Sequence, residues 1–227
     1  AVSEKGNLFN APETYMQKIA TGNHIPKGTI DLDYSVEKNI ENYSRETNKK
    51  PSEITVCILD RSRHDRIIEE LKRLKVNIKY ISDGDVAGVL LVTDKKFGVD
   101  IFMGIGGGPE GVIAATALDK LNCIFQGRFL FNSKSDVIRA KKMGIKDLNK
   151  KYEINEIVRG DSIFCATGIT DCDLMKGIIK KNDKFITETI VTHDKNVLQI
   201  VKNEVSITWL IEKITIKDRS MVPSSIG

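Results

Sequence analysis

Residues 54–85 have the sequence ITVCILDRSRHDRIIEELKRLKVNIKYISDGD, and this stretch decides the fold class. Residues 54–59 form a continuous run of β-branched and other apolar side chains, which is typical of a strand buried on both faces. Residues 63–74 carry apolar side chains at helical spacing, and residues 76–81 form a second apolar run. The order strand, helix, strand predicts a parallel sheet with helices on its faces.

The same alternation extends along most of the chain and predicts an α/β fold with a mostly parallel sheet and flanking helices. The further elements that we expect are a helix over 33–45, a helix over 86–92, a strand over 99–103, a helix over 111–121 and a strand over 162–166. The C-terminal part differs, because residues 185–191, 197–201 and 205–216 are typical of the strands of an antiparallel hairpin or sheet edge.

The polar, proline-containing segment NKKPSE (48–53) is the best candidate for a domain boundary. We therefore expect one domain over 1–50 and a second over 51–227. A length of 227 residues suits one large domain or two small ones.

The charge balance argues against a nucleic-acid binder, because 35 Lys and Arg residues oppose 31 Asp and Glu residues and leave a net charge of +4. No apolar run approaches the roughly 20 residues of a membrane span. The four cysteines, Cys57, Cys123, Cys165 and Cys172, form no C-x-x-C pair. These features predict a cytosolic protein with reduced thiols, without a disulfide framework or a zinc cluster.

Charged or glycine-rich segments follow the four predicted strands of the sheet. They are DRSR (60–63), DGD (83–85), GIGGGPEG (104–111) and TGITD (167–171). Ligands of open α/β sheets bind beyond the carboxyl ends of the strands. We therefore expect these segments to meet at one edge and to form a site for a small, polar, anionic ligand.

Arg61 and Arg63 lie at a predicted strand-to-helix turn. Two guanidinium groups beside the free N–H groups of a helix start suit a phosphate. The alternative is that both are solvated loop side chains. We expect His64, next to them, to be a residue of the first helical turn and not a catalyst.

The segment Asp83-Gly84-Asp85 has two interpretations. It suits a tight turn in which Asp85 caps the next helix. It also suits a carboxylate pair that accepts hydrogen bonds from sugar hydroxyls. Asp83 is the better candidate for ligand contact, because the cap needs it less.

The glycine-rich segment contains a G-x-G-x-x-G pattern, which is typical of dinucleotide-binding turns. We reject that interpretation, because Pro109 has no N–H to offer a pyrophosphate and Glu110 would place a negative charge beside it. Pro109 suits the first position of a helix. Glu110 is then either an acid that interacts with the helix dipole or a ligand of a hard cation such as Mg²⁺.

Several of these motifs, in this order and spacing, resemble those of the class II fructose-1,6-bisphosphatases of the GlpX type. The matching segments are NAPETYMQKIA (10–20), DRSRH (60–64), SDGDVAG (82–88), GIGGGPEGVIAATAL (104–118), GR (127–128), ATGITDCDLMKG (166–177) and TETIV (187–191). The resemblance implies the layered sugar-phosphatase α/β fold of fructose-1,6-bisphosphatases and inositol monophosphatases. It also implies that residues 1–50 belong to a metal-binding domain and residues 51–227 to a sugar-phosphate-binding domain.

The activity implied by the resemblance is metal-dependent hydrolysis of the 1-phosphate of fructose 1,6-bisphosphate, which yields fructose 6-phosphate in gluconeogenesis. The expected cofactor is Mn²⁺ or Mg²⁺, and the expected protein is a cytoplasmic homo-oligomer that binds neither nucleic acid nor membrane. Two alternatives stay open. One is another sugar or inositol phosphatase of the same superfamily, including a sedoheptulose bisphosphatase, and the other is a non-catalytic sugar-phosphate-binding protein.

The resemblance also implies roles for individual residues. The substrate-binding residues expected from it are Tyr15, Arg61, Ser62, Arg63, Asp83, Gly84, Asp85 and Gly107, and the expected metal ligand is Glu110. The catalytic threonine and the other metal carboxylates of the family lie around a D-P-hydrophobic-D/E-G-T motif, which this sequence does not contain. We therefore expect that the chain begins after that motif and that it lacks bisphosphatase activity alone.

Overall fold

The computed structural model describes residues 1–193 and 198–206, which divide into two compact units. The core unit comprises the described residues of 1–164 and 192–198, and the hairpin unit comprises those of 165–191 and 199–227. Each unit is described by itself below.

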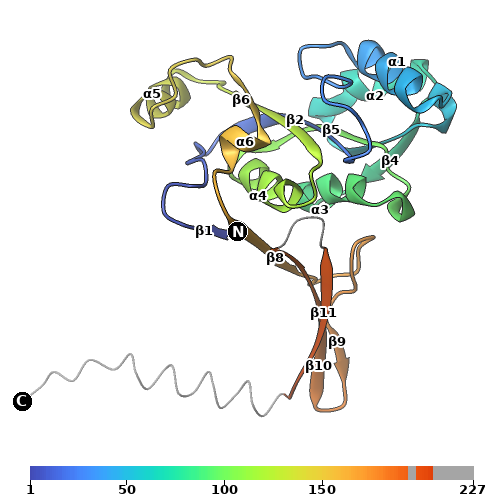
Figure 1. Cartoon of the computed structure of the whole chain (residues 1–227), viewed down its shortest axis with the longest axis vertical. Coiled ribbons are helices and arrows are strands. Elements are labelled where there is room, and N and C mark those ends of the chain that lie inside the picture. Colours follow the sequence, from blue (N-terminus) through green and yellow to red (C-terminus); the bar gives the residue numbers. More distant parts are fainter. Residues whose placement is uncertain (194–197, 207–227) are drawn as a thin grey trace, which may run out of the picture. The chain divides into compact units, whose positions relative to one another are not determined.

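A six-stranded sheet forms the centre of the core unit (Figure 1). The strand order is β4 (Asn77–Ile81), β3 (Thr55–Leu59), β5 (Ile101–Gly107), β2 (Tyr15–Thr21), β6 (Ile124–Leu130) and β7 (Lys151–Glu153). The pairs β4–β3 and β3–β5 are parallel, whereas β2 is antiparallel to β5 and β6, and β6 is antiparallel to β7. The sheet is therefore mixed, and the expectation of a mostly parallel sheet is wrong.

Strand β2 also bears on the expected domain boundary. Residues 15–21 pair along their whole length with β5 and β6, so this N-terminal segment lies inside the same sheet as β3 and β4. The segment at 48–53 contains only a short 3₁₀ helix, Pro51–Glu53, that leads into β3. The division between the two compact units lies between residues 164 and 165.

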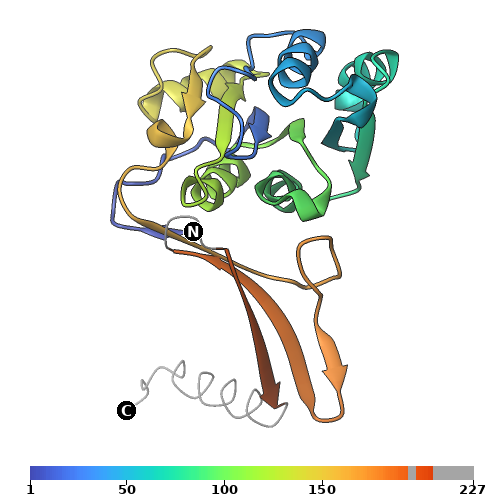
Figure 2. The same cartoon turned by 45° about the vertical axis from the view of Figure 1, so that its right-hand side comes forward.

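Helices cover both faces of the sheet (Figure 2). α1 (Val36–Thr47) and α2 (Asp65–Arg73) lie on one face, while α3 (Asp85–Leu90) and α4 (Gly108–Asp119) lie on the other. Ser35 caps α1, since its hydroxyl accepts a hydrogen bond from the N–H of Lys38. The four expected helices are thus confirmed within a few residues, and the patterns did not predict α5 (Lys134–Lys142) or α6 (Ile154–Ile157).

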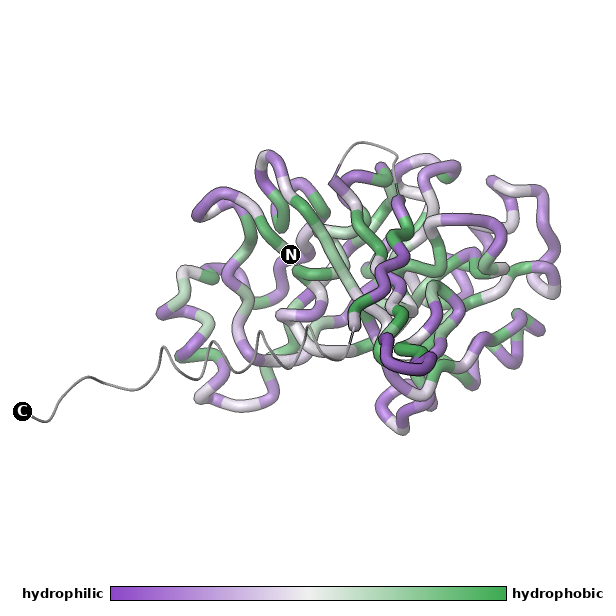
Figure 3. Tube along the Cα trace, turned by 90° about the horizontal axis from the view of Figure 1, so that it is seen from below, coloured by the Kyte–Doolittle hydropathy of each residue, from purple (hydrophilic) through white to green (hydrophobic). Residues whose placement is uncertain are grey.

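Successive residues of the strands pack alternately against the helices on the two faces of the sheet. Val56 of β3 and Ile101 of β5 belong to one buried cluster with Ile40 and Tyr43 of α1 and with Leu71 of α2. Their neighbours Cys57 and Phe102 point to the other layer, where they flank Gly88 of α3. The hydrophobic segments concentrate along the strands, and the outer loops are mostly hydrophilic (Figure 3).

The glycine-rich segment is a strand for half of its length. β5 continues through Gly104 to Gly107, because β2 offers it an antiparallel partner up to the pair Tyr15–Gly107. The predicted strand end at Met103 is therefore wrong. α4 begins at Gly108, so that Pro109 is its second residue and not its first.

The fourth predicted strand is β8 (Ser162–Thr167), but it is not part of the six-stranded sheet. Its start pairs antiparallel with β1 (Val2–Ser3), and its side chains alternate between buried and exposed instead of being buried throughout. The segment TGITD that follows belongs to the hairpin unit. The expectation that four segments meet at one edge of the sheet is therefore wrong for TGITD, and at most the other three segments, all in the core unit, can meet there.

The hairpin unit contains three antiparallel strands, β9 (Ile179–Lys181), β10 (Lys184–Thr192) and β11 (Gln199–Ser206). The predicted C-terminal hairpin is confirmed by the pairing of β10 with β11, but the break expected between residues 201 and 205 is wrong, because β11 runs unbroken from Gln199 to Ser206. Residue 197 and the predicted part beyond Ser206 lie outside the described residues. In the part of the chain that the structure describes, none of the helices combines the length and the apolar character that crossing a bilayer requires.

Met16 fills a space in the core that two glycines leave open. A Cβ atom added at Gly111 of α4 would lie 2.4 Å from the Met16 sulfur, and one added at Gly127 of β6 would lie 2.5 Å from it. Both distances are far below van der Waals contact, so the methionine is wedged between α4 and β6.

We expect Gly127→Ala to destabilise the protein when residue 16 is methionine and to stabilise it when residue 16 is alanine. Alone, it should destabilise the protein by about 1–3 kcal/mol, because it overpacks the space around Met16. Met16→Ala should cost about 2–5 kcal/mol by leaving a cavity. In that background the methyl group added at position 127 enters the cavity, so Gly127→Ala should stabilise. Urea unfolding of the four proteins measures this, and the same sign in both backgrounds would contradict the wedge.

Candidate functional site

A pocket of about 550 Å³ lies where β5 ends and β2 begins. It is lined by Glu13, Thr14, Tyr15, Gly107, Pro109, Glu110, Asn132 and Asp136. Three of the predicted site residues are among them, namely Tyr15, Gly107 and Glu110. The pocket follows directly from strand register, because Tyr15 and Gly107 are opposite each other in the β2–β5 ladder.

Glu110 folds back over Gly107. A Cβ atom added at Gly107 would lie 1.9 Å from Oε2 of Glu110, so only glycine leaves room for this carboxylate. Glu110 is also in the first turn of α4, where the helix dipole favours a negative charge. Both interpretations of Glu110, as an acid that interacts with the helix dipole and as a ligand of a hard cation, therefore agree with its position.

Two contacts hold the Arg63 side chain next to Tyr15, which lines the pocket. Its Nε–H donates a hydrogen bond of 2.8 Å to the carbonyl oxygen of Ile105, and its guanidinium carbon lies 5.2 Å from the centre of the Tyr15 ring. A cation over an aromatic face is a favourable arrangement. Within the described residues no further hydrogen bond occupies the guanidinium, so its Nη groups are available to an anion.

His64 ties the turn that carries Arg63 to the sheet. Its Nδ1 lies 2.7 Å from the carbonyl oxygen of Leu59 at the end of β3, and its Nε2 accepts a 2.7 Å hydrogen bond from the N–H of Ile105 in β5. The proton is therefore on Nδ1. Burial lowers the pKa of His64 below its ordinary value of 6.5, and the positive charge of Arg63 lowers it further. His64 is a structural anchor, in agreement with its expected non-catalytic role.

Lys18 is a buried charged residue that the sequence analysis did not single out. It lies fully buried in β2 and forms an ion pair with Asp85 at the start of α3. Burial lowers the pKa of Lys18, while the charges of Asp85 and Glu110 act in the opposite direction. The only signal in the sequence is a lysine at an inward position of a strand that was itself not predicted.

Asp85 does not cap α3, contrary to one of the two interpretations of its segment. The N-cap is Gly84, which has a φ angle of +83°, and Asp85 is the first helical residue. Asp83 stays exposed and accepts a 2.8 Å hydrogen bond from the N–H of Gly84. The turn thus points only one of its two carboxylates into the core unit.

Arg61, Ser62 and Asp83 do not line the pocket. The guanidinium of Arg61 donates a 2.9 Å hydrogen bond to the carbonyl oxygen of Asp60, and the side chains of all three residues are exposed. Their contacts are those of a solvated loop, and their substrate-binding roles stay predictions.

The carboxylates of the pocket do not complete a metal site. No group of three or more His, Cys, Asp or Glu side chains is arranged to hold a metal ion among residues 1–193 and 198–206. Glu13 and Asp136 each form an ion pair of 3.8 Å with Arg139, so one guanidinium offsets part of their charge. Glu110 has the oxygen donors that Mg²⁺ or Mn²⁺ prefers, but it is one ligand where such a cation needs about six.

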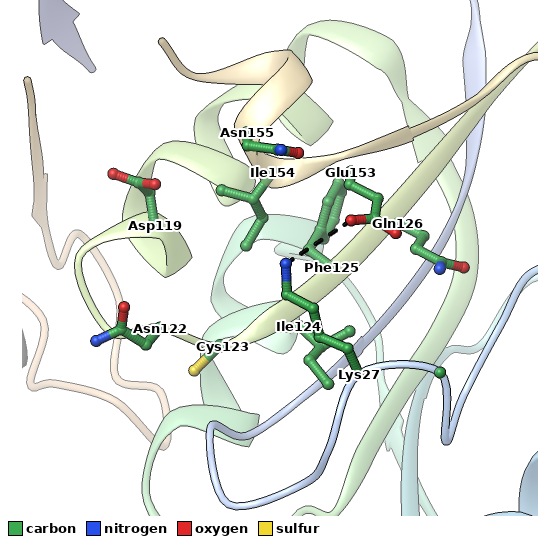
Figure 4. Close-up of a pocket in the computed structure, with 11 residues that line it drawn as sticks. Lys27, Asp119, Asn122, Cys123, Ile124, Phe125, Gln126, Glu153, Ile154 and Asn155 are labelled. Atoms are coloured by element: carbon green, nitrogen blue, oxygen red, sulfur yellow. Dashed lines mark ion pairs between the residues drawn. The ribbon is translucent and has the colours of Figure 1, made fainter. Parts of the chain in front are cut away.

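A second cavity of about 250 Å³ lies elsewhere in the core unit, beside β6 and β7 (Figure 4). Lys27 and Glu153 form an ion pair of 3.9 Å across it, and Gln126 and Asn155 also line it. None of the predicted site residues is among its lining residues. The pocket at Gly107 is therefore the better candidate for the functional site.

The family model and the similar proteins that match this chain all point to the same family. A sequence model described as bacterial fructose-1,6-bisphosphatase, glpX-encoded, matches residues 1–205. The chain is 38% identical over 206 residues to a D-fructose 1,6-bisphosphatase class 2/sedoheptulose 1,7-bisphosphatase of Synechococcus sp. (strain JA-3-3Ab), a match that covers 84% of this chain and 58% of the relative. It is 37% identical over 227 residues to fructose-1,6-bisphosphatase 1 class 2 of Escherichia coli (strain K12), covering 94% of this chain and 66% of the relative. The chain thus spans less than two thirds of the length of these relatives.

We expect His64 to make the protein less stable in mild acid. Because its pKa in the folded chain is below the ordinary 6.5, the unfolded chain takes up a proton first as the pH falls. The stability that neutral His64 contributes is therefore present above about pH 6.5 and is lost progressively below it. His64→Gln can keep both hydrogen bonds but cannot titrate, so its free energy of unfolding should depend less on pH from about pH 7.5 to about pH 5.

The matched control for this experiment is His24→Gln. The pKa of His24 is also lowered, chiefly by burial, but this variant keeps the contribution of His64. Denaturant unfolding at a series of pH values measures both profiles. An unchanged pH profile in His64→Gln would show that burial does not hold the ring neutral.

Proposed function

This chain belongs to the family of glpX-encoded bacterial fructose-1,6-bisphosphatases, and we propose that its protein hydrolyses the 1-phosphate of fructose 1,6-bisphosphate. The products are fructose 6-phosphate and inorganic phosphate. The observation that supports this most is that Tyr15, Gly107 and Glu110 line one pocket and that Arg63 lies over the Tyr15 ring, because these residues come from three separate motifs of the family. A cytoplasmic location and a homo-oligomeric state belong to the same proposal.

Each group around the pocket has a distinct part in binding. The guanidinium of Arg63 is held by Ile105 and Tyr15, so its free N–H groups present a fixed positive fork to a phosphate. Tyr15 is 45% exposed and therefore accessible to the sugar. Gly107 has no side chain, so the backbone of β5 can approach the ligand closely. These groups orient the substrate.

Glu110 is proposed as one ligand of Mn²⁺ or Mg²⁺. Its carboxylate has the hard oxygen donors that these ions prefer. The further ligands would come from groups outside the described residues, since those residues provide no complete set. When bound, such a cation polarises a phosphoryl oxygen and stabilises the leaving oxygen.

A second substrate is also a candidate. The Synechococcus relative is named as both a fructose 1,6-bisphosphatase and a sedoheptulose 1,7-bisphosphatase, and this chain is about as similar to it as to the Escherichia coli relative. We therefore propose sedoheptulose 1,7-bisphosphate as an alternative substrate of the same pocket. Phosphate release by the native protein from the two bisphosphates and from an inositol monophosphate tests the substrate class. Release from none of them would contradict the proposed function.

Glu110→Gln should abolish metal-dependent turnover in the native protein and leave the fold intact. The change keeps the shape of the side chain and removes the charge that a metal ligand needs. If Glu110 served only the helix dipole, the loss would be about 0.3–1 kcal/mol of stability, and activity would survive. The measurement is phosphate release at saturating Mn²⁺, with circular dichroism as the test of folding.

The matched control is Glu13→Gln, which removes a carboxylate from the rim of the same pocket and should retain most of the activity. Near-normal turnover by Glu110→Gln at saturating Mn²⁺ would reject the ligand role.

Arg63→Ala should raise KM for fructose 1,6-bisphosphate by roughly 10- to 150-fold, the range of a charged hydrogen bond of about 1.5–3 kcal/mol. If Arg63 holds the phosphate that is not cleaved, its contact is the same in the ground and transition states, so kcat should change little. Arg63→Lys should recover only part of the loss, because an ammonium group cannot form the bidentate fork.

Steady-state kinetics measure this effect, with Mn²⁺ titrated separately. Arg66→Ala is the control, because Arg66 is a neighbouring, exposed arginine that pairs only with Glu70 among the described residues. An unchanged KM in Arg63→Ala would show that Arg63 is a solvated loop side chain that does not bind the substrate. A large fall in kcat alone would place it at the scissile phosphate.

A further inference from the structure

Strand β11 of the hairpin unit is an edge strand among the strands that the structure describes. It pairs with β10 through eight consecutive residue pairs, and it is last in the strand order of its sheet. No other described strand pairs with its outer side. The outer side of an edge strand presents backbone N–H and C=O groups that can pair with a strand of another chain.

β11 has few of the features that usually prevent such pairing. Its sequence, QIVKNEVS (199–206), contains no proline, and its ladder with β10 is unbroken by a bulge. Its eight residues exceed the roughly five or six of a common strand. A charged side chain can also protect an edge. Here, however, Lys202 forms an ion pair of 2.9 Å with Glu188 of β10, and Glu204 forms one of 3.4 Å with Lys184, so both are held over their own sheet.

The sequence of β11 is complementary to itself in the antiparallel direction. In a twofold-symmetric pair centred on Asn203, Lys202 of each copy is opposite Glu204 of the other. Val201, which is 40% exposed, is opposite Val205 in the same way. Opposite charges and apolar side chains at directly opposed positions stabilise a strand pair.

Other registers of the same pairing lose this match. A symmetric antiparallel pair keeps each side chain on its own face of the sheet, so the register can change only in steps that preserve the faces. The nearest shift in one direction places Lys202 opposite Lys202 of the other copy, and the nearest shift in the other direction places Glu204 opposite Glu204. Like charges at opposed positions are destabilising, so the register centred on Asn203 is favoured.

We propose that two copies of this chain pair through the outer edge of β11, antiparallel and centred on Asn203, so that their hairpin units form one continuous sheet. The inference rests on the homo-oligomeric part of the proposed function and deepens it, because it names the surface and the register. It does not depend on the reaction that the protein catalyses.

Two charge reversals test the register. In Lys202→Glu, the new carboxylate is opposite Glu204 of the other copy, and in Glu204→Lys the new ammonium group is opposite Lys202. Either variant alone should therefore have half of the assembly mass of the unmodified protein. An equimolar mixture of the two variants again places opposite charges at both pairs, so the mixture should recover the full mass.

The measurement is light scattering after size-exclusion chromatography of the native protein and its variants at low ionic strength. Circular dichroism tests folding. Recovery on mixing also separates the proposal from a folding defect, because a misfolded variant would not be restored by a second one.

Lys180→Glu is the matched control. It reverses the same charge in the same unit, but Lys180 belongs to β9, which pairs with β10 on the side away from β11. This variant should keep the full mass. A halved mass in Lys180→Glu would show that any charge reversal in the hairpin unit disturbs the assembly, and it would overturn the proposal.

The remaining outcomes separate the inference from the proposed function. A monomeric unmodified protein would contradict both the homo-oligomeric state and this inference, while the proposed hydrolysis would stand. An assembly whose mass neither variant changes forms through another surface, which overturns the inference alone. Halved masses that do not recover on mixing would also overturn it, because the opposed charges would then not be those of residues 202 and 204.

Discussion

Strand β2 is antiparallel to both of its neighbours, and this double pairing holds the core unit together. On one side it completes the ladder of β5, which belongs to the parallel group β4–β3–β5, and on the other side it completes the ladder of β6. Backbone N–H and C=O groups in the middle of a sheet need partners on both sides. Without β2, the glycine-rich end of β5 would have no partner that keeps it extended, and Tyr15 would not lie opposite Gly107 at the pocket.

Glycines at the end of β5 and the start of α4 leave space for charged side chains. They replace side chains at positions where charged groups must come close to the backbone, namely Glu110 over Gly107 and the Lys18–Asp85 pair beside Gly106. A glycine-rich segment between a strand and a helix is usually considered for its flexibility or for its N–H groups. Here its main contribution is volume, because it leaves space for two carboxylates and an ammonium group within one turn of chain.

The sequence predicted the parts of the fold that are local in the chain. The unit β3–α2–β4 was predicted because each of its elements has a recognisable pattern of apolar residues. Elements that are consecutive in the sequence also pack against each other in this unit. β2 was missed because Gln17 and Lys18 interrupt its apolar run, and β6 because Gly127 and Arg128 do the same. Their pairing, which makes the sheet mixed, depends on segments far apart. The same reason applies to the site. Tyr15, Gly107 and Glu110 were found through motifs, whereas the ion pair of Lys18 has a partner that no local pattern indicates.

The position of β2 in the chain has a consequence for the order in which the protein folds. Its residues 15–21 are synthesised early, but their partners are residues 101–107 and 124–130. Closing so long a loop is entropically unfavourable and slow, whereas β3, α2 and β4 form contacts over short separations. A growing chain therefore keeps β2 unpaired until β5 has emerged and the long loop between the two strands has closed. Until β2 pairs with it, β5 is an edge strand of the group β4–β3–β5, and an exposed edge of this kind can associate with other nascent chains.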